Sequence, residues 1–375
     1  MKKLFFAALA VCVFASCSKD NNEAGTPEPG KQASLNISVT SPDMTRAGGF
    51  APSTDNTVAD FTVFVVDDMG NIPSGWEKHF TSAATAGSLT VSTSAKKVYV
   101  IANAGDKTGI YTTEAALVDG AKEDLNSQFN GRWATGAVSI ATGDWVTDPG
   151  TGNVTATKSL SLDFIAARIR LTVVNNMINY DGSTAGTTIL SHVAVLNARG
   201  QSRLFPAASG TSLIPAAYDA NKKFLAGIDM SAMGNKPAPV DFTLDAVNLK
   251  DAYSSSGGGD TKTYYYYVYE NDAVTAATLP TIVTLIGTNA ENIPTPVYFP
   301  VHLAPYEKFT PGSSAMTSGL KRGRTYDVTM DLRGDATEGN GGGGTDPSIP
   351  VTSASVDVSI SINDWIPVTL GKQFE

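Results

Sequence analysis

The side chains that could carry out catalysis in this 375-residue chain are few, and their spacing does not suit a reaction. The three histidines, His79, His192 and His302, lie in separate segments, and no His-Glu-x-x-His pair is present to bind zinc. No Gly-x-Ser-x-Gly sequence is present to expose a nucleophilic serine. We therefore expect no enzymatic activity, no metal centre and no cofactor.

Carboxylates occur throughout the expected loops and are the remaining candidates for chemistry. Acid–base pairs need two carboxylates held together in a shared site, whereas loop carboxylates usually form turns or remain solvated. We expect the carboxylates of Asp67-Asp68, and those of Asp119, Glu123 and Asp124, to form turns or remain solvated. Weak calcium binding by such loops stays open.

The N-terminus predicts a covalent modification at Cys17. Lys2 and Lys3 precede twelve apolar residues, 4–15, which form a signal-peptide core too short to span a bilayer. Residues 14–17, Phe-Ala-Ser-Cys, resemble a bacterial lipobox, in which the signal is cut before the cysteine and the sulfur receives a lipid. We expect a lipoprotein with a palmitate-type anchor; an ordinary signal peptide with an incidental cysteine is the alternative.

Composition supports export and an all-β fold. Cys12 lies inside the signal, so the mature chain beyond Cys17 has no thiol for a disulfide or a catalytic site. Gly and Pro are abundant and only 17% of residues are charged. The net charge of −9 argues against nucleic acid as a partner.

Nearly every periodic segment alternates with period two, as β-strands do. Residues 111–130 are the exception, because Leu117, Ala121, Leu125 and Phe129 recur at steps of four and predict a helix. Many short strands separated by turn signals indicate β-sandwiches. We place a boundary near residue 165, with one β-sandwich over 47–165 and a second over 166–336.

Two alternating segments of similar character lie at opposite ends of the chain. The first places Leu35, Ile37 and Val39 on one face. The second follows a glycine-rich linker, 337–350, and places Val356, Val358, Ile360 and Ile362 on one face. About eleven residues of this linker could extend to roughly 35 Å, enough to carry the second strand away from its own domain.

Arg46 is an accessible basic residue in the loop that follows the first strand. Thr45 and Ala47-Gly48-Gly49 flank it in a segment rich in Pro, Gly, Asp and Thr, the kind of loop in which proteases cut. A cut between Arg46 and Ala47 would release the lipid anchor and the first strand together.

These features together resemble fimbrillin, the FimA-type major fimbrial subunit family that forms the type V pili of Bacteroidales. The resemblance rests on the lipobox, on Thr-Arg-Ala at 45–47, and on three further segments: Val98 to Ala104, Leu320 to Val328 and Asn363-Asp364-Trp365. Gly323 and Arg324 depart from the family, which often has Asn and a bulkier residue there.

The resemblance implies two tandem transthyretin-like β-sandwich domains and a C-terminal donor strand in 351–375. It also implies export as a lipoprotein, with 1–16 as signal peptide and 17–46 as a removable propeptide. An arginine-specific protease would cut after Arg46 and expose a groove, and the C-terminal strand of another subunit would fill it. The chain would move from the cell outer membrane into an extracellular fimbrium that supports adhesion to host receptors.

Other interpretations remain. A monomeric surface lipoprotein that binds glycans or host proteins would use exposed tryptophans, for which Trp76, Trp133 and Trp145 are candidates. A fimbrial tip or accessory subunit is a further alternative, although a tip has no use for a donor strand. Arg333-Gly334-Asp335 matches the integrin-binding tripeptide, a three-letter match that arises readily by chance.

Overall fold

A computed structural model describes the parts of the chain that form its sheets and their short connections. These parts are residues 30–40, 57–81, 86–120, 122–124, 133–180, 188–196, 198–199, 201–205, 224–225, 250–255, 259–271, 281–289, 295–303, 320–336, 343–344 and 356–364. Within them, no helix has the length and apolar character needed to cross a membrane.

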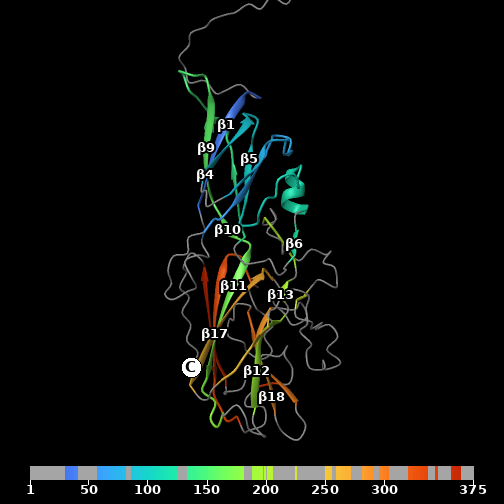
Figure 1. The fold of residues 1–375 in the computed structure, drawn as a ribbon, viewed down its shortest axis with the longest axis vertical. Helices are drawn as coiled ribbons and strands as arrows, with labels where there is room; N and C mark the ends of the chain where they lie inside the picture. The colour runs from blue at the N-terminus through green and yellow to red at the C-terminus, as the bar shows by residue number, and fades with distance from the viewer. Residues whose placement is uncertain are drawn as a thin grey trace, which may run out of the picture.

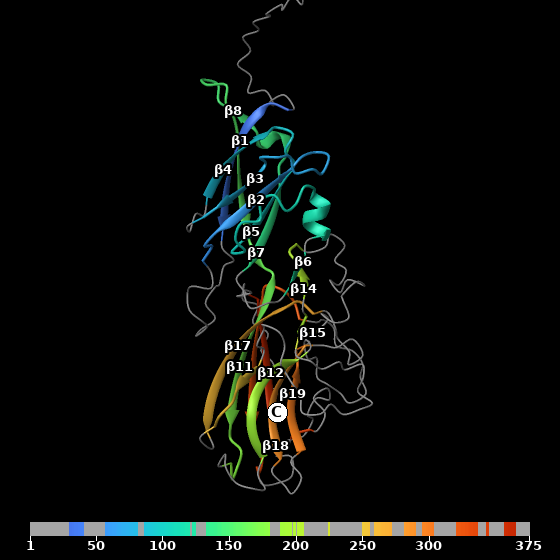
Figure 2. The same ribbon diagram turned by 45° about the vertical axis from the view of Figure 1, so that its right-hand side comes forward.

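Strands dominate the described residues, and the all-β prediction is confirmed. The strands form four larger sheets and two small ones. Two of the larger sheets lie at one end of an elongated molecule and two at the other, stacked along the longest axis (Figures 1 and 2).

The upper pair of sheets in Figure 1 is built from residues 32–164. The first sheet contains, in spatial order, β4 (Ala86–Ser92), β1 (Gln32–Thr40), β9 (Val154–Ser161) and β8 (Val146–Thr147). The second contains β10 (Asp163–Phe164), β7 (Ala134–Ser139), β5 (Lys97–Ala102), β2 (Phe61–Val66) and β3 (Glu77–Phe80).

The lower pair of sheets is built from residues 166–364. One sheet contains β17 (Asp260–Tyr269), β11 (Ala166–Asn175), β20 (Arg324–Leu332) and β21 (Val356–Asp364). The other contains β16 (Lys250–Ala252), β12 (Thr188–Leu196), β18 (Ile282–Asn289) and β19 (Thr295–His302).

Each pair of sheets encloses buried apolar side chains. One cluster, from Ala33 to Phe164, lies between the upper sheets. A larger cluster fills the lower pair and extends to the second face of β2 and β5 through Phe64, Val66 and Tyr99. Alternation along the strands creates both, since successive side chains point to opposite faces.

The helix prediction for 111–130 is confirmed only over residues 114–120. Two α-helical residues, 114–115, lead into a π-helical turn, η2 (Ala116–Gly120), and a short strand, β6 (Lys122–Asp124), follows. β6 pairs with β14 (Gln201–Arg203), a strand some eighty residues away in the sequence, and this long-range pairing overrides the local helical periodicity. Leu117 is buried as predicted.

The remaining short elements complete the framework. A 3-10 turn, η3 (Thr142–Asp144), precedes β8. β13 (Ala198–Arg199) pairs with β15 (Phe224–Leu225) as a two-stranded sheet.

Candidate functional site

The strand β1 is an interior strand of its sheet although it lies near the start of the chain. It pairs antiparallel with β4, where Ile37 lies opposite Gly87, and parallel with β9, where Ile37 lies opposite Lys158. Each edge of β1 is therefore hydrogen-bonded to a neighbour. Removing this strand would leave β9 paired only with β8 and β4 without a partner in this sheet, so that an unpaired edge of each faces a common gap.

The inward face of β1 contributes directly to the core of the upper sheets. Ala33, Leu35, Ile37 and Val39 are 4, 0, 2 and 4% exposed. They belong to the same apolar cluster as Phe61, Val63 and Val65 of β2, on the opposite sheet. The prediction that Leu35, Ile37 and Val39 share one buried face is confirmed.

The outward face of β1 is polar and forms two side-chain contacts with its neighbours. The Ser34 and Ser88 hydroxyl oxygens are 3.0 Å apart, and those of Ser38 and Ser159 are 2.7 Å apart. Asn36 lies between these serines.

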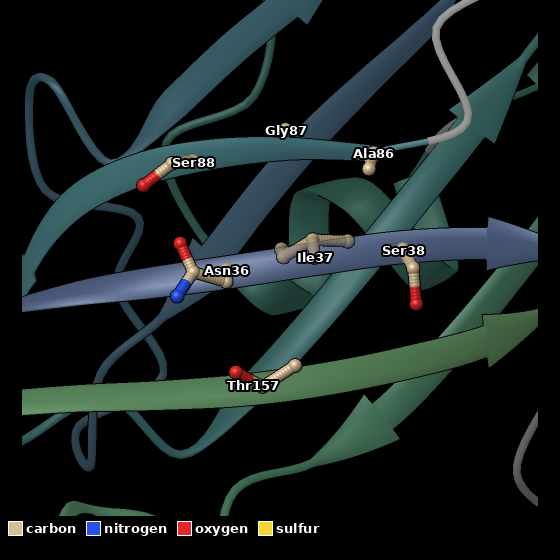
Figure 3. Close-up of a pocket in the computed structure, with 7 residues that line it drawn as sticks. All are labelled: Asn36, Ile37, Ser38, Ala86, Gly87, Ser88 and Thr157. Carbon is tan, nitrogen blue, oxygen red and sulfur yellow. The ribbon is translucent and has the colours of Figure 1, made fainter.

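An open hollow of about 440 Å³ lies on this outward face. Figure 3 shows β1 running between β4 and β9 there, with Asn36, Ile37 and Ser38 along its length and Thr157 on β9. Ala86 and Ser88 of β4, opposite Ser38 and Asn36, have small side chains, whereas a Cβ on Gly87 would clash with the Phe80 ring.

The C-terminal strand β21 lies at the edge of its sheet, whereas β1 lies in the interior of its own. Among the described strands β21 is the last of its sheet and pairs with β20 alone, antiparallel, from Val356 opposite Leu332 to Asp364 opposite Arg324. The donor residues Val356, Val358, Ile360 and Ile362 all lie in this strand. The sequence also allows residues 351–374 to fold back on their own domain as an edge hairpin, with 366–374 as the second strand. β21 is such an edge strand, and residues 366–374 lie outside the described residues.

Between the two pairs of sheets, one arginine connects several segments. The Arg322 guanidinium, just before β20, donates to the Leu204 and Arg203 carbonyl oxygens at 3.2 Å and to the Ser202 hydroxyl at 3.3 Å. Its Nε donates to Glu270 at 3.2 Å. No sequence signal marked this arginine as a junction, because two of its four partners are backbone carbonyls and all four are distant in sequence.

Residues 201–205 in turn contact the upper sheets. The Phe205 ring meets the Tyr99 ring edge-on at 5.0 Å, and the Thr135 hydroxyl donates to the Leu204 carbonyl at 3.0 Å. Tyr99 donates to Glu114; burial and this hydrogen bond raise the pKa of the Tyr99 hydroxyl. The two ends of the molecule are thus joined by a specific interface, and not only by the chain at residue 165.

One ion pair supports the strand next to β1. The Lys158 ammonium, on β9, lies 2.5 Å from the Asp144 carboxylate. The hydrogen bond from Lys158, together with the backbone N–H of Ala141, lowers the pKa of the Asp144 carboxyl below its ordinary value of 3.8.

This lowered pKa predicts an acid-sensitive contribution to stability. The contribution is present above the unfolded-state pKa near 3.8 and is lost as pH falls through the lower folded-state pKa. Asp144→Asn should therefore reduce the difference in thermal stability between pH 7 and pH 3. The matched control is Asp68→Asn, at an exposed turn position. An unchanged pH dependence in Asp144→Asn would contradict the prediction.

The other sequence candidates are not gathered into a site. Asp67 forms a turn, as predicted, because its Oδ1 accepts the backbone N–H of Met69 at 2.9 Å and of Asn71 at 2.8 Å. Among the described residues, no group of three or more His, Cys, Asp or Glu side chains is placed to hold a metal ion.

The candidate tryptophans pack within the molecule. Trp145 is buried in the upper cluster and Trp76 packs against the same cluster. Trp133 packs against the other cluster, with the Lys107 ammonium 4.9 Å from its ring centroid. The three indoles therefore serve packing and do not form one exposed stacking surface.

The integrin-type tripeptide is engaged within the protein. The Arg333 guanidinium donates to Asp331 at 2.6 Å, and the Asn179 amide donates to both Asp335 oxygens at 3.1 Å. A receptor that reads this tripeptide needs both charges, so these contacts compete with such a role.

Cys17, Arg46 and Ala47 lie outside the described residues, so lipidation and processing stay predictions from the sequence. The same holds for the signal peptide 1–16 and most of the linker 337–350.

Known structures share this fold along nearly the whole chain. A protein of Bacteroides eggerthii with a proposed role in cell adhesion is 23% identical, with a TM-score of 0.63, covering 91% of this chain and 98% of its own. The fimbrilin FimA of Porphyromonas gingivalis is 16% identical, with a TM-score of 0.56, covering 92% of this chain and 99% of its own. No curated protein sequence matches the chain.

A family profile matches more than half of the chain. Residues 166–365 match the C-terminal domain of the FimA-like major fimbrial subunit protein. This match begins at β11 and ends one residue after β21, so the edge strand lies within the matched region. With this profile on its C-terminal half, the chain belongs to the FimA-like fimbrial subunit family.

Proposed function

We propose that this chain is a shaft subunit of a surface pilus that polymerises by strand exchange after proteolysis. The chain reaches the outer membrane as a lipoprotein anchored through Cys17, and cleavage after Arg46 then releases residues 17–46 together with β1. The C-terminal segment 351–375 of another subunit fills the vacant position. The family supports the pilus role; the steps are our inference.

The observation that carries the proposal is the position of β1. It is a central strand with four side chains at most 4% exposed, and it lies on the N-terminal side of the predicted cleavage site. Its loss would uncover an apolar trough flanked by the unpaired edges of β4 and β9. Such a gap is a template for strand addition, with backbone hydrogen bonds on both sides and alternate pockets for side chains.

The position of β21 supplies the matching donor. As an edge strand it has one hydrogen-bonded neighbour, β20, and would gain two neighbours in the position that β1 vacates. Burying four Val or Ile side chains contributes on the order of 6–12 kcal/mol before ordering costs. The donor strand would leave the single hydrogen-bonded ladder with β20 and form two ladders, with β4 and β9, which favours exchange.

The geometry of this exchange produces a filament. The groove and the donor strand are unlike surfaces near different ends of the molecule (Figure 1). A head-to-tail contact between unlike surfaces does not close on itself and continues as a linear polymer. A subunit with both groove and donor suits the shaft, where it supports adhesion of the whole fimbrium to a host surface.

Arg46→Ala tests the processing step. We expect a chain that stays in the membrane fraction, keeps lipidated Cys17 as its N-terminus by mass spectrometry, and forms no filaments by electron microscopy. Arg46→Lys should behave in the same way if the protease is arginine-specific. Thr45→Ala, one residue away, is the control and should mature to an Ala47 N-terminus. Normal filaments from Arg46→Ala would show that cleavage at this residue is not required.

A further inference from the structure

An eight-residue sequence pattern occurs at both ends of the chain. Residues 33–40 read Ala-Ser-Leu-Asn-Ile-Ser-Val-Thr, and residues 354–361 read Ala-Ser-Val-Asp-Val-Ser-Ile-Ser. Three positions are identical, and each of the others keeps its aliphatic, amide-or-acid, or hydroxyl character. The first copy spans most of β1, and the second copy begins two residues before β21.

We propose that this repeat sets the register of assembly: residues 354–361 of a second copy of this chain replace residues 33–40 position by position. Ala354 takes the place of Ala33, Val356 that of Leu35, Val358 that of Ile37, and Ile360 that of Val39. The inference rests on the strand exchange proposed above and adds its partner, its direction and its alignment. The donor runs as β1 does, antiparallel to β4 and parallel to β9.

The buried face of β1 distinguishes this register from its neighbours. Ala33 is only 4% exposed, so the smallest of the four side chains lies inside the apolar cluster. A register shifted by two residues puts Val356 at this position, and the extra methyl groups would overpack it. A shift of two residues in the other direction puts Thr352 at the position of Ala33 and Ala354 at the position of Leu35, which would bury a hydroxyl and leave a cavity. A shift by one residue turns the apolar face outward.

The outward face favours the same register. Ser34 contacts Ser88 and Ser38 contacts Ser159, and the aligned donor has a serine at both positions, Ser355 and Ser359. Asp357 then replaces Asn36, a residue of nearly the same shape. Asn36 lines the open hollow of about 440 Å³, where a carboxylate stays hydrated (Figure 3).

Cysteine cross-linking can measure the register in assembled filaments. Asn36 lies directly opposite Ser88 and Ser34 contacts it, so a cysteine at 88 can reach donor residues at positions 36 and 34. The native chain beyond Cys17 has no cysteine to interfere. Neighbouring registers move the donor by about 6.6 Å along the strand, more than a disulfide tolerates.

We expect filaments of the double variant Ser88→Cys/Asp357→Cys to give a ladder of covalent oligomers on a non-reducing gel. Ser88→Cys/Ser359→Cys and Ser88→Cys/Ser361→Cys are matched controls and should give none. A ladder from either control would overturn the register while leaving strand exchange intact. Filaments in which no donor cysteine cross-links to position 88 would overturn both the register and the exchange at β1.

Inhibition by peptides gives a second test that needs no variant subunit. A peptide of residues 352–364 should block filament growth of the processed chain by filling its groove. Ala354→Leu in the peptide should raise the inhibitory concentration roughly tenfold or more, because position 33 is buried. Ser353→Leu in the peptide falls at the exposed position of Gln32 and should leave the inhibitory concentration unchanged. Equal potency of the Ala354→Leu and wild-type peptides would contradict the proposed register, and failure of the wild-type peptide would contradict the strand exchange itself.

Discussion

Deletion of residues 351–375 is expected to abolish filaments while leaving a folded, exported monomer. The deleted segment includes β21, which in the described part of the chain is hydrogen-bonded to β20 alone. β20 keeps β11 on its other side and keeps its buried side chains, Tyr326, Val328, Met330 and Leu332. The lower sheets therefore retain their core, whereas the groove of the next subunit loses its ligand.

Electron microscopy of surface material and the unfolding curve of the purified monomer measure the two parts of this prediction. Deletion of residues 366–375 is the matched control, because it retains all of β21 and should preserve assembly. Normal filaments from the longer deletion would disprove the donor role of the C-terminal segment. Loss of the folded monomer would instead show that β21 is needed for folding.

Leu35→Ala is expected to destabilise the precursor by about 2–5 kcal/mol and to have no effect on the mature filament. The precursor loses stability because Leu35 is fully buried, and truncating it leaves a cavity in the upper cluster. The filament is unaffected because strand exchange has removed β1 and supplied another side chain at that position.

Denaturant unfolding of the lipid-anchored precursor and thermal dissociation of filaments give the two readings. Asn36→Ala, on the outward face of the same strand, is the control and should change precursor stability by no more than about 0.5 kcal/mol. An equal loss of stability in precursor and filament would mean that β1 stays in the assembled subunit.

The sequence predicted the strands through their alternation and missed the partners of short segments. Leu35, Ile37 and Val39 share a buried face because period-two spacing fixes the side of a strand on which each residue lies. The helix expected over 111–130 forms over 114–120 but does not continue through 122–124, because β6 pairs there with the distant β14. Arg322 was missed as a junction because it binds the carbonyls of residues 203 and 204, which any residue type could provide.

By itself, the sequence determined the all-β class, the resemblance to a fimbrial family, and the presence of two similar strands at the ends of the chain. These properties follow from local pattern and composition, which need no knowledge of contacts. The tertiary structure alone decided that β1 lies inside its sheet between β4 and β9, whereas β21 lies at an edge beside β20. The reason is physical: strand order depends on hydrogen bonds between segments up to 157 residues apart, and no local pattern encodes those partners.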